Sequence, residues 1–232
     1  MNDMDKKFLQ NQVWDVTPKQ AIEIQKQIAD LVRITPLDKK IKTIAGADVS
    51  LNMFGKDLYA GIIVLSYPDL NVIEHACVKV EVAFPYIPGL LSFREIPGLL
   101  KCYEKLKIKP DLIIVDGQGI AHPRKMGIAA HFGVLINTPT IGCGKSKLYG
   151  EFANAENPGD AQKITDPKTR DQIGWAFKSK RRANPLIISP GHLISVDQSL
   201  EIIKTCLRGY RLPEPTRLAH ELVNAFRLGN LS

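Results

Sequence analysis

One strand-like run, Thr43-Ile-Ala-Gly-Ala-Asp-Val-Ser50, mixes apolar and small residues with a single acid, Asp48. Two further strand-like runs follow at about 58–68 and 71–82. The connections between the three runs, at 52–57 and 68–71, are short enough for antiparallel hairpins. The sequence therefore predicts a three-stranded antiparallel meander.

Helices and strands alternate after this meander. The pattern predicts a helix at about 93–106, interrupted or bent near Pro97-Gly98, then strand 111–116, helix 125–137 and strand 139–143. Because parallel strands need a crossover connection, which these helices supply, we expect the fourth and fifth strands to lie parallel to the first. The predicted class is α/β, with a ribonuclease-H-like mixed five-stranded sheet flanked by helices.

The two ends of the chain carry further elements. Thr17-Pro18 is typical of a helix start, and a helix is expected from there to about Ile34. Apolar runs at 174–177 and 185–189 either extend the sheet or pair as a hairpin, before helices near 196–208 and 214–227. We expect a single domain over 1–232, made of an N-terminal helix (about 17–34), a ribonuclease-H-like core (about 42–145) and C-terminal strands and helices (about 174–228).

The composition fits one folded core. The 232 residues are 44% hydrophobic and 24% charged. No apolar run approaches the roughly 20 residues of a membrane span, and the first residues are too polar for a secretory signal, so we expect a cytoplasmic protein with no membrane contact. Four cysteines without C-x-x-C spacing predict buried thiols rather than disulfides or zinc ligands.

Three acids lie at the ends or starts of predicted elements: Asp48 in the first strand, Glu95 near a helix start, and Asp116 after the run Leu112–Val115. The predicted strand order brings Asp48 and Asp116 together, with Glu95 facing them. Burying ionised carboxylates is costly unless a cation or donor offsets the charge. Three together would form an oxygen site suited to Mg²⁺ or Mn²⁺. Taken singly, each acid has a solvated turn or helix-cap carboxylate as its alternative.

The formal net charge of +7 fits a partner with a phosphate backbone. Basic residues gather beside turns in Lys178–Arg182, in Arg124-Lys125 and in Lys145–Lys147. A divalent-metal site combined with a cationic surface points to phosphodiester chemistry on nucleic acid. Solvated basic turns are the alternative for each cluster.

Several polar side chains are further candidates. His122 follows a glycine-rich segment after Asp116 and is a candidate metal ligand or phosphate contact, whereas His131 lies on an apolar helix face and is expected in the core or on its flank. His192 is ambiguous, although a helix start is one interpretation. Lys145 follows Gly142-Cys-Gly, but Pro139 stands where a nucleotide-binding phosphate loop has glycine, so that motif fails. Lys145 either neutralises a phosphate or a leaving oxygen, or is simply solvated.

The loop that begins Phe84-Pro-Tyr-Ile-Pro-Gly89 is richer in proline and aromatic residues than a surface loop requires. Enzymes that act on damaged bases insert such a side chain, here Tyr86, into the base stack while the target nucleotide is flipped out. A packed loop that covers the sheet edge is the alternative.

Seven short motifs together resemble the endonuclease V family, and the resemblance spans about residues 15–228. They are Gly46–Ser50, Pro85–Gly89, Phe93–Pro97, Val115–Gly119, His122-Pro123, Gly142–Ser146 and Ser189–His192. The resemblance implies a Mg²⁺-dependent repair nuclease, with Mn²⁺ as a possible substitute. It would recognise deoxyinosine in DNA and cut the second phosphodiester bond on the 3′ side of the lesion, leaving 3′-hydroxyl and 5′-phosphate ends.

The resemblance also implies roles for individual residues. Asp48, Glu95 and Asp116 would be the metal-binding acids and His220 a fourth residue of the metal site, although on sequence alone His220 would have a surface role. Lys145 would steady the scissile phosphate or the leaving group, and His122 the nearby backbone. Tyr86, flanked by Pro85 and Ile87, would fill the gap beside the lesion. The flipped base would lie among Leu91, Gly117, Gly127, Ile128 and Leu148.

Two alternative functions stay open. One keeps the fold and the metal site but takes inosine in single-stranded RNA, for which a 2′-hydroxyl contact near the cut would be the discriminating feature. The other is a nucleic-acid-binding protein without catalysis, which the intact set of acids argues against. A monomer is expected by default.

Overall fold

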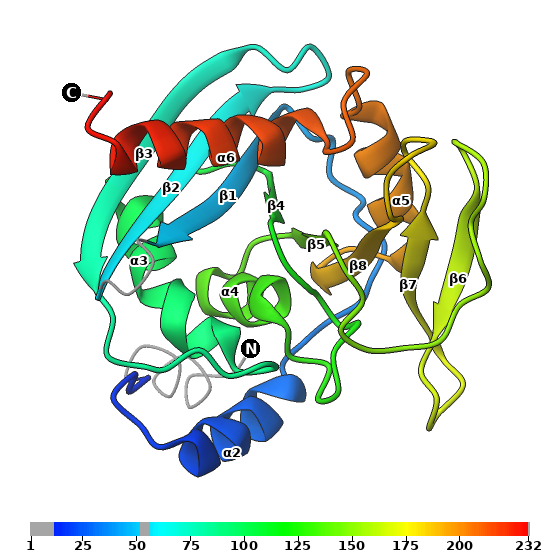
Figure 1. Ribbon diagram of the computed structural model, residues 1–232, viewed down its shortest axis with the longest axis horizontal. Helices are drawn as coiled ribbons and strands as arrows, with labels where there is room; N and C mark the ends of the chain where they lie inside the picture. Colours follow the sequence, from blue (N-terminus) through cyan, green and yellow to red (C-terminus); the bar gives the residue numbers. More distant parts are fainter. Residues whose placement is uncertain (1–11, 52–55, 232) are drawn as a thin grey trace.

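The computed structural model describes residues 12–51 and 56–231, and in this part of the chain eight strands form one mixed sheet (Figure 1). The strand order is β3-β2-β1-β4-β5-β8-β7-β6. The strands are β1 (Thr43–Leu51), β2 (Asp57–Ser66), β3 (Val72–Glu81), β4 (Leu112–Val115), β5 (Thr140–Gly144), β6 (Ala161–Thr165), β7 (Gln172–Phe177) and β8 (Leu186–His192).

The pairing confirms the predicted fold class and corrects its strand count. β1, β2 and β3 form the antiparallel meander, and β4 is parallel to both β1 and β5. The number of five strands is wrong, because β8, β7 and β6 continue the sheet in antiparallel pairs beyond β5. Residues 52–55 of the predicted first hairpin connection lie outside the described residues.

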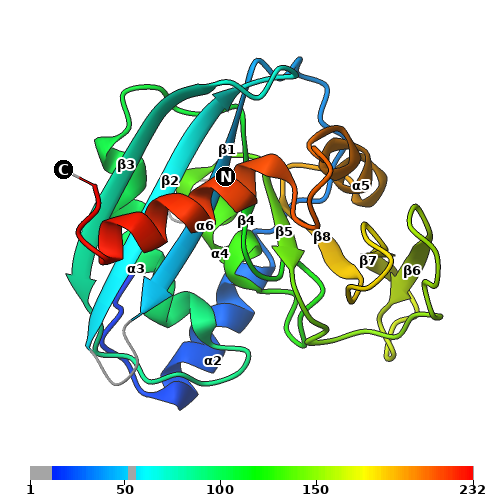
Figure 2. The ribbon, with the colours of Figure 1, turned by 45° about the horizontal axis from the view of Figure 1, so that its top comes forward.

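Helices cover both faces of the sheet (Figure 2). They are α2 (Pro18–Ala29), α3 (Leu91–Lys105), α4 (Ile128–Ile136), α5 (Val196–Thr205) and α6 (Glu214–Arg227). Ile96 of α3 and Phe132 of α4 belong to the apolar core on one face, whereas Ala219 of α6 belongs to the core on the other. The sheet is therefore the middle layer of three. None of the helices described is long and apolar enough to cross a membrane.

Three local predictions are corrected. α2 starts as expected, with the Thr17 side chain accepting the Gln20 N–H, but it ends at Ala29 rather than near Ile34. α3 is one helix that continues through Pro97, so the predicted break is wrong and only the alternative of a bend remains. His192 ends strand β8, and the next helix starts only at Val196.

Two predictions about polar or reactive side chains are confirmed. His131 is completely buried, where its ring packs against Phe93. All four cysteines are free thiols; three of them are buried and Cys77 is partly buried.

The side chains of strand β1 point alternately to the two faces of the sheet. Ala45 and Ala47 belong to the core under α3 and α4, whereas Ile44 belongs to the core under α6. Gly46 faces α6 directly, because a Cβ atom placed there would lie 1.8 Å from the carbonyl oxygen of Pro215. Asp48 is two residues farther along the same face, since side chains alternate with a period of two. The strand register therefore turns Asp48 toward α6.

Candidate active site

Asp48, within β1, and Asp116, directly after β4, are neighbours on two adjacent parallel strands. The register pairs Ala47 of β1 with Val115 of β4, and the Asp116 N–H donates to the Ala47 carbonyl oxygen at 3.0 Å. The next residue on each strand is an aspartate. The third acid, Glu95, comes from α3, which packs on the face of the sheet opposite to α6. The strand order expected from the sequence thus brings the predicted acids together.

Asp48 and Glu95 are buried, and the negative charges of the three acids repel one another. Asp48 is 6% exposed and Glu95 is 7% exposed. Burial, and then the charge of Asp116, raises the pKa of Asp48 to about 6. Burial, followed by the charges of Asp48 and Asp116, holds the pKa of Glu95 well above its usual value. Negative charge at this position lacks sufficient compensation from the protein, which a bound cation would supply.

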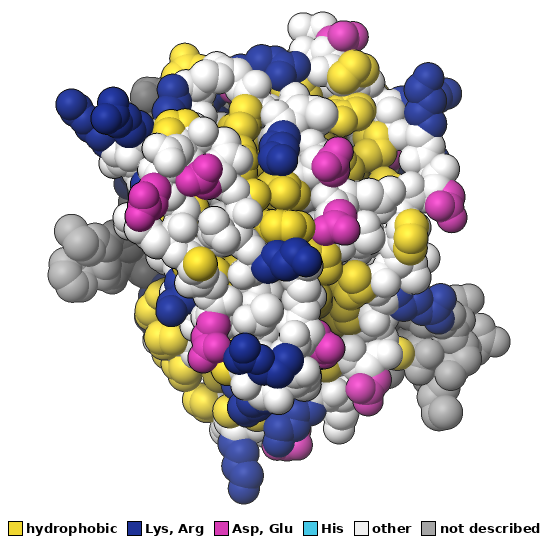
Figure 3. Space-filling view, turned by 90° about the vertical axis from the view of Figure 1, so that its right-hand side faces the viewer, with side chains coloured by type: hydrophobic (Ala, Val, Ile, Leu, Met, Phe, Trp, Pro, Cys, Tyr) yellow, Lys and Arg dark blue, Asp and Glu magenta, His cyan; other side chains and the backbone are white. Residues whose placement is uncertain are grey.

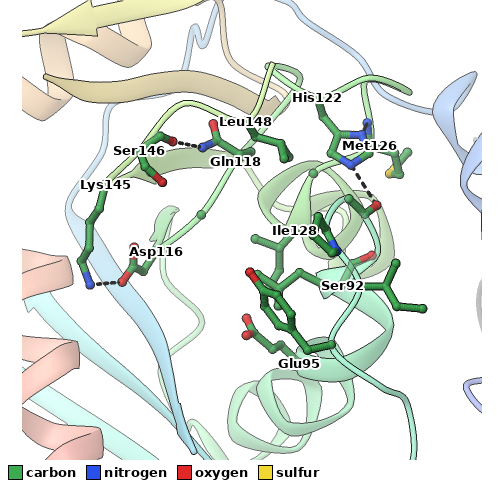
Figure 4. A pocket seen from close by; sticks show the side chains of 18 of the residues that line it. Ser92, Glu95, Asp116, Gln118, His122, Met126, Ile128, Lys145, Ser146 and Leu148 are labelled. Carbon is green, nitrogen blue, oxygen red and sulfur yellow. Dashed lines mark hydrogen bonds and ion pairs between the residues drawn. The ribbon is translucent and has the colours of Figure 1, made fainter. Parts of the chain in front are cut away.

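Lys145 extends from the end of β5 toward the acids, and its Nζ forms an ion pair with Asp116 Oδ2 (Figure 4). Burial opposes the charge, but the carboxylates of Asp116 and Asp48 outweigh burial and raise the pKa of Lys145. The side chain is therefore an ammonium group that is paired with a carboxylate of the site and is not held by solvent alone. Arg211 Nη2 donates to the Lys145 carbonyl oxygen at 2.8 Å, which anchors this turn.

His220 supports Asp48 from α6. Its Nδ1 lies 2.7 Å from Asp48 Oδ2, and Asn224 Nδ2 lies 3.1 Å from its Nε2. Ser50 Oγ donates to Asn224 Oδ1 at 2.9 Å, which turns the amide nitrogen of Asn224 toward the ring. In this arrangement Nε2 accepts a hydrogen bond and Nδ1 donates one to the carboxylate. His220 therefore orients a predicted metal ligand from behind.

The donor set fits a hard divalent cation. Buried carboxylate oxygens are the ligands that Mg²⁺ and Mn²⁺ prefer. In the described part of the chain no three His, Cys, Asp or Glu side chains already stand in ligating positions around one point. Asp48 is engaged by His220 and Asp116 by Lys145, so the acids are near one another but each has a different partner.

A cavity of about 350 Å³ opens beside the acids (Figure 4). This volume is in the range of small-molecule sites, which begins at about 300 Å³. Twelve of the predicted site residues line it: Asp48, Tyr86, Ile87, Leu91, Glu95, Asp116, Gly117, His122, Gly127, Ile128, Lys145 and Leu148. Pro85 and His220 do not line the cavity.

Close backbone approach shapes one wall of the cavity. A Cβ atom on residue 117 would lie 2.5 Å from Ile128 Cγ2, and the backbone there has a φ of +147°. Glycine at 117 therefore lets the strand-end loop and the start of α4 come together. Such a wall presents peptide groups to a ligand rather than long side chains.

Other side chains that line the cavity were not expected from the sequence, among them Gln25, Ser92, Gln118 and Met126. Gln118 Nε2 donates to the Ser146 carbonyl oxygen at 2.9 Å and so anchors the turn after Lys145. Of these residues, only Gln25 could have been singled out from the sequence, because it is a polar residue within the apolar stripe of the first helix. Gln118, flanked by glycines, shows no pattern that sets it apart from a solvated turn residue.

The loop around Tyr86 is packed at both ends and exposed at its tip. Phe84 and Leu90 are buried in a core with Phe93, and Arg94 Nη1 donates to the Phe84 carbonyl oxygen at 2.8 Å. Tyr86 is 69% exposed. The two ends of the loop are thus packed, as in the alternative of a packed loop, and the exposed tip is free for the predicted insertion of Tyr86.

His122 is placed differently from its predicted role. Its Nδ1 accepts the N–H groups of Arg124 at 3.2 Å and Met126 at 3.3 Å, and its Nε2 lies 2.9 Å from the Gly89 carbonyl oxygen. Burial lowers the pKa of His122 to about 4, so the ring is neutral at neutral pH. Both ring nitrogens are engaged by the backbone, so neither is free for the metal or phosphate contact that the sequence suggested.

Basic residues do not gather on every face of the molecule. On the face over β6, β7 and α5, Lys and Arg side chains alternate with Asp and Glu (Figure 3). In the turn after β7, Lys180, Arg181 and Arg182 are exposed, whereas Lys125 pairs with Asp171 at 3.5 Å. The positive charge of the chain is thus distributed in local clusters.

Known proteins are similar to this chain in sequence and in fold. Residues 26–221 match the family model described as Endonuclease V. A protein named endonuclease V from Gloeobacter violaceus is 46% identical over 217 residues, which cover 92% of this chain and 88% of that protein. The crystal structure of the Bacillus subtilis endonuclease V superposes with a TM-score of 0.87 at 28% identity, covering 94% of this chain and 96% of the other.

A third relative was solved with nucleic acid. The Ciona intestinalis endonuclease V, in complex with a 24mer DNA containing an inosine followed by a ribo-adenosine, superposes with a TM-score of 0.81 at 25% identity. The match covers 92% of this chain and 98% of that one. Together these matches identify the chain as a nuclease, an enzyme that hydrolyses phosphodiester bonds. The chain belongs to the endonuclease V family.

Proposed function

We propose that this protein is a Mg²⁺-dependent DNA repair endonuclease that recognises deoxyinosine. It cuts the second phosphodiester bond on the 3′ side of the lesion and leaves 3′-hydroxyl and 5′-phosphate ends. The observation that carries this proposal is that Asp48, Glu95, Asp116 and Lys145 line the same cavity as Gly117 and Gly127, at which the backbone is not covered by a side chain. Chemistry on a phosphate and recognition of a base then take place side by side.

Recognition of the lesion uses the loop and the cavity. The exposed Tyr86 fills the gap left in the base stack, while the flipped base enters the cavity between Leu91 and Ile128. Hypoxanthine carries a carbonyl where adenine carries an amine. A backbone N–H directed there is satisfied by hypoxanthine and left unpaired by adenine, a difference of about 1–3 kcal/mol.

Cleavage uses the acids and Lys145. Asp48, Glu95 and Asp116 would hold Mg²⁺, which when bound lowers the pKa of a water and stabilises the departing 3′ oxygen. Mn²⁺ can replace it, because both ions take oxygen ligands. Lys145 places an ammonium group beside Asp116, where it can donate to the scissile phosphate or the leaving oxygen. His220 keeps Asp48 in its orientation.

A second candidate is cleavage of inosine in single-stranded RNA by the same site. It is favoured by the Ciona intestinalis complex, whose DNA carries a ribo-adenosine directly after the inosine. A 2′-hydroxyl at that position is thus compatible with a relative of this fold. For this chain we keep DNA as the primary substrate, a monomer as the active form and the cytoplasm as its location.

The deciding experiment is strand cleavage of end-labelled oligonucleotides of matched sequence. One is DNA with a single deoxyinosine and the other is RNA with a single inosine, each incubated with Mg²⁺, with EDTA, and with Asp116→Ala protein. A Mg²⁺-dependent cut one nucleotide beyond the lesion, absent with the variant, supports the proposal, and the faster strand identifies the substrate. If neither strand is cut although both are bound, the protein is a binder without catalysis.

A further inference from the structure

Gln25 is a buried amide in a helix that lies outside the sheet. α2 lies below α4 in Figure 2. The Gln25 side chain is 1% exposed, between the buried Ala21 and Ile28 on the inner face of the helix. A buried amide without partners costs about 1–3 kcal/mol, so its hydrogen bonds show why the fold tolerates it.

The amide nitrogen of Gln25 joins two segments of backbone. Nε2 donates to the Gly89 carbonyl oxygen at 3.1 Å and to the Met126 carbonyl oxygen at 3.2 Å. Gly89 ends the loop that carries Tyr86, and Met126 comes just before the start of α4. Both residues line the cavity beside the acids. One side chain thus ties together the two walls between which the flipped base would lie.

Two more donors meet at the same carbonyl. Gly89 O accepts from His122 Nε2 at 2.9 Å and from Arg124 Nη2 at 2.7 Å. Arg124 Nε in turn donates to Gln25 Oε1 at 2.6 Å, so that Arg124 and Gln25 support each other. The Gly89 carbonyl is therefore held by three side chains from two separate segments, which fixes the exit of the Tyr86 loop.

We infer that Gln25 is a positioning residue that sets the width of the base pocket by linking the Gly89 and Met126 carbonyl oxygens. The inference rests on the proposed function for the identity of the ligand, a flipped purine. A change of about 1 Å in the wall spacing moves backbone donors away from the base and can cost about 100-fold in rate. The loss should fall mainly on discrimination between bases, because Asp48, Asp116 and Lys145 are held by other contacts.

The test compares Gln25→Glu with Gln27→Glu. The first replaces the donating amide by an acceptor that repels both carbonyl oxygens, and the second makes the same change on the exposed face of the same helix. Gln25→Met, which keeps the length of the side chain without its hydrogen bonds, replaces Gln25→Glu if the latter does not fold. Thermal melting checks the fold of each variant.

Two readouts are measured. The first is the ratio of single-turnover cleavage rates for deoxyinosine and deoxyadenosine oligonucleotides with Mg²⁺. The second is amide hydrogen exchange in residues 84–92 without DNA. We expect the Gln25 variants to lower the ratio at least about tenfold and to speed exchange, while Gln27→Glu changes neither.

Two outcomes would overturn the inference: an unchanged ratio with both rates reduced equally, or unchanged exchange in residues 84–92. Failure of the proposed function is recognised separately, because the wild-type protein would then cut neither oligonucleotide. In that case hydrogen exchange alone still decides whether Gln25 holds the two walls.

Discussion

His220 Nδ1 and Asp48 Oδ2 lie 2.7 Å apart, so the last helix described directly supports an acid in the first strand. The other oxygen of Asp48 accepts the N–H of its own neighbour Val49 at 2.9 Å. Each oxygen of the Asp48 carboxylate thus accepts one hydrogen bond from the protein and keeps a lone pair that can bind a ligand. This is the arrangement expected of an acid that is oriented for a ligand rather than neutralised by the protein.

Replacing His220 should weaken metal binding without unfolding the protein. Loss of a residue that orients a metal ligand typically costs about 10- to 100-fold in affinity or activity, so we expect His220→Ala to raise the Mg²⁺ concentration needed for half-maximal cleavage by about that factor. His75→Ala removes an exposed histidine on β3 and is the control. An unchanged Mg²⁺ titration curve for His220→Ala would contradict this role.

Stability without metal should decrease as Asp48 loses its proton. Burial and the charge of Asp116 raise its folded-state pKa from 3.8 to about 6. Between these values the folded protein holds more protons than the unfolded chain, so this contribution to stability is lost as pH rises toward 6. We expect Asp48→Asn to remove this part of the pH dependence of the melting temperature and to be more stable than the wild type at neutral pH without metal.

Added Mg²⁺ should stabilise the protein more at higher pH. The cation binds the ionised carboxylates and competes with the protons held by Asp48 and Glu95, whose pKa values are both raised by burial. Melting curves with and without saturating Mg²⁺ at about pH 5 and about pH 8 measure the difference. An equal shift at the two pH values would argue against these acids as the binding site.

Lys145 should matter for the chemical step more than for binding. Removing one group that stabilises developing charge costs about 10²- to 10³-fold in rate, which we expect for Lys145→Met under single-turnover conditions. Affinity for uncleaved deoxyinosine DNA should change much less. Lys163→Met, at an exposed position on β6, is the control. Equal losses in affinity and rate would instead assign Lys145 to binding.

Tyr86 should act on lesion binding and not on stability. The side chain is 69% exposed, so Tyr86→Ala should leave the melting temperature unchanged. Base–aromatic stacking is worth about 1–3 kcal/mol, so affinity for deoxyinosine DNA should fall at least about fivefold. Tyr86→Phe keeps the ring and should bind like the wild type. If Tyr86→Ala binds deoxyinosine DNA as tightly as the wild type, Tyr86 does not fill the gap in the base stack.

The parts of this fold that were predictable carry strong local signals. Asp48 is the one acid within an apolar strand run and Asp116 directly follows another, and the crossover rule was enough to place those strands side by side. Strand β6 has only one buried residue, Ile164, among polar neighbours, so it shows neither alternation nor a continuous apolar run. The periodicity of Ala21, Ile24, Ile28 and Leu31 predicts a helix up to about Ile34, but Leu31 packs against the core beyond the end of α2 at Ala29.

Residues of the site could be predicted where the residue type alone indicates its chemistry. They could not be predicted where the role of a side chain depends on its hydrogen-bond partner in the folded structure. Asp48 and Lys145 are recognisable as acid and base wherever they lie. His122 and Gln25 differ, because their roles follow from which carbonyl oxygens the fold brings to them. Gly89 accepts hydrogen bonds from both, although it is far from each in the sequence. Contacts of this kind appear only once the tertiary structure is known.

The position of α6 on β1 also has a consequence for synthesis of the protein. The ribosome makes Asp48, Glu95 and Asp116 well before it makes His220. Until α6 docks, one apolar face of β1 and β2 is uncovered and Asp48 lacks its histidine. Because domains fold as their elements emerge during translation, we expect the nascent chain to gain nuclease activity only when α6 has left the exit tunnel. Unfinished chains would then be unable to nick the nucleic acid around them.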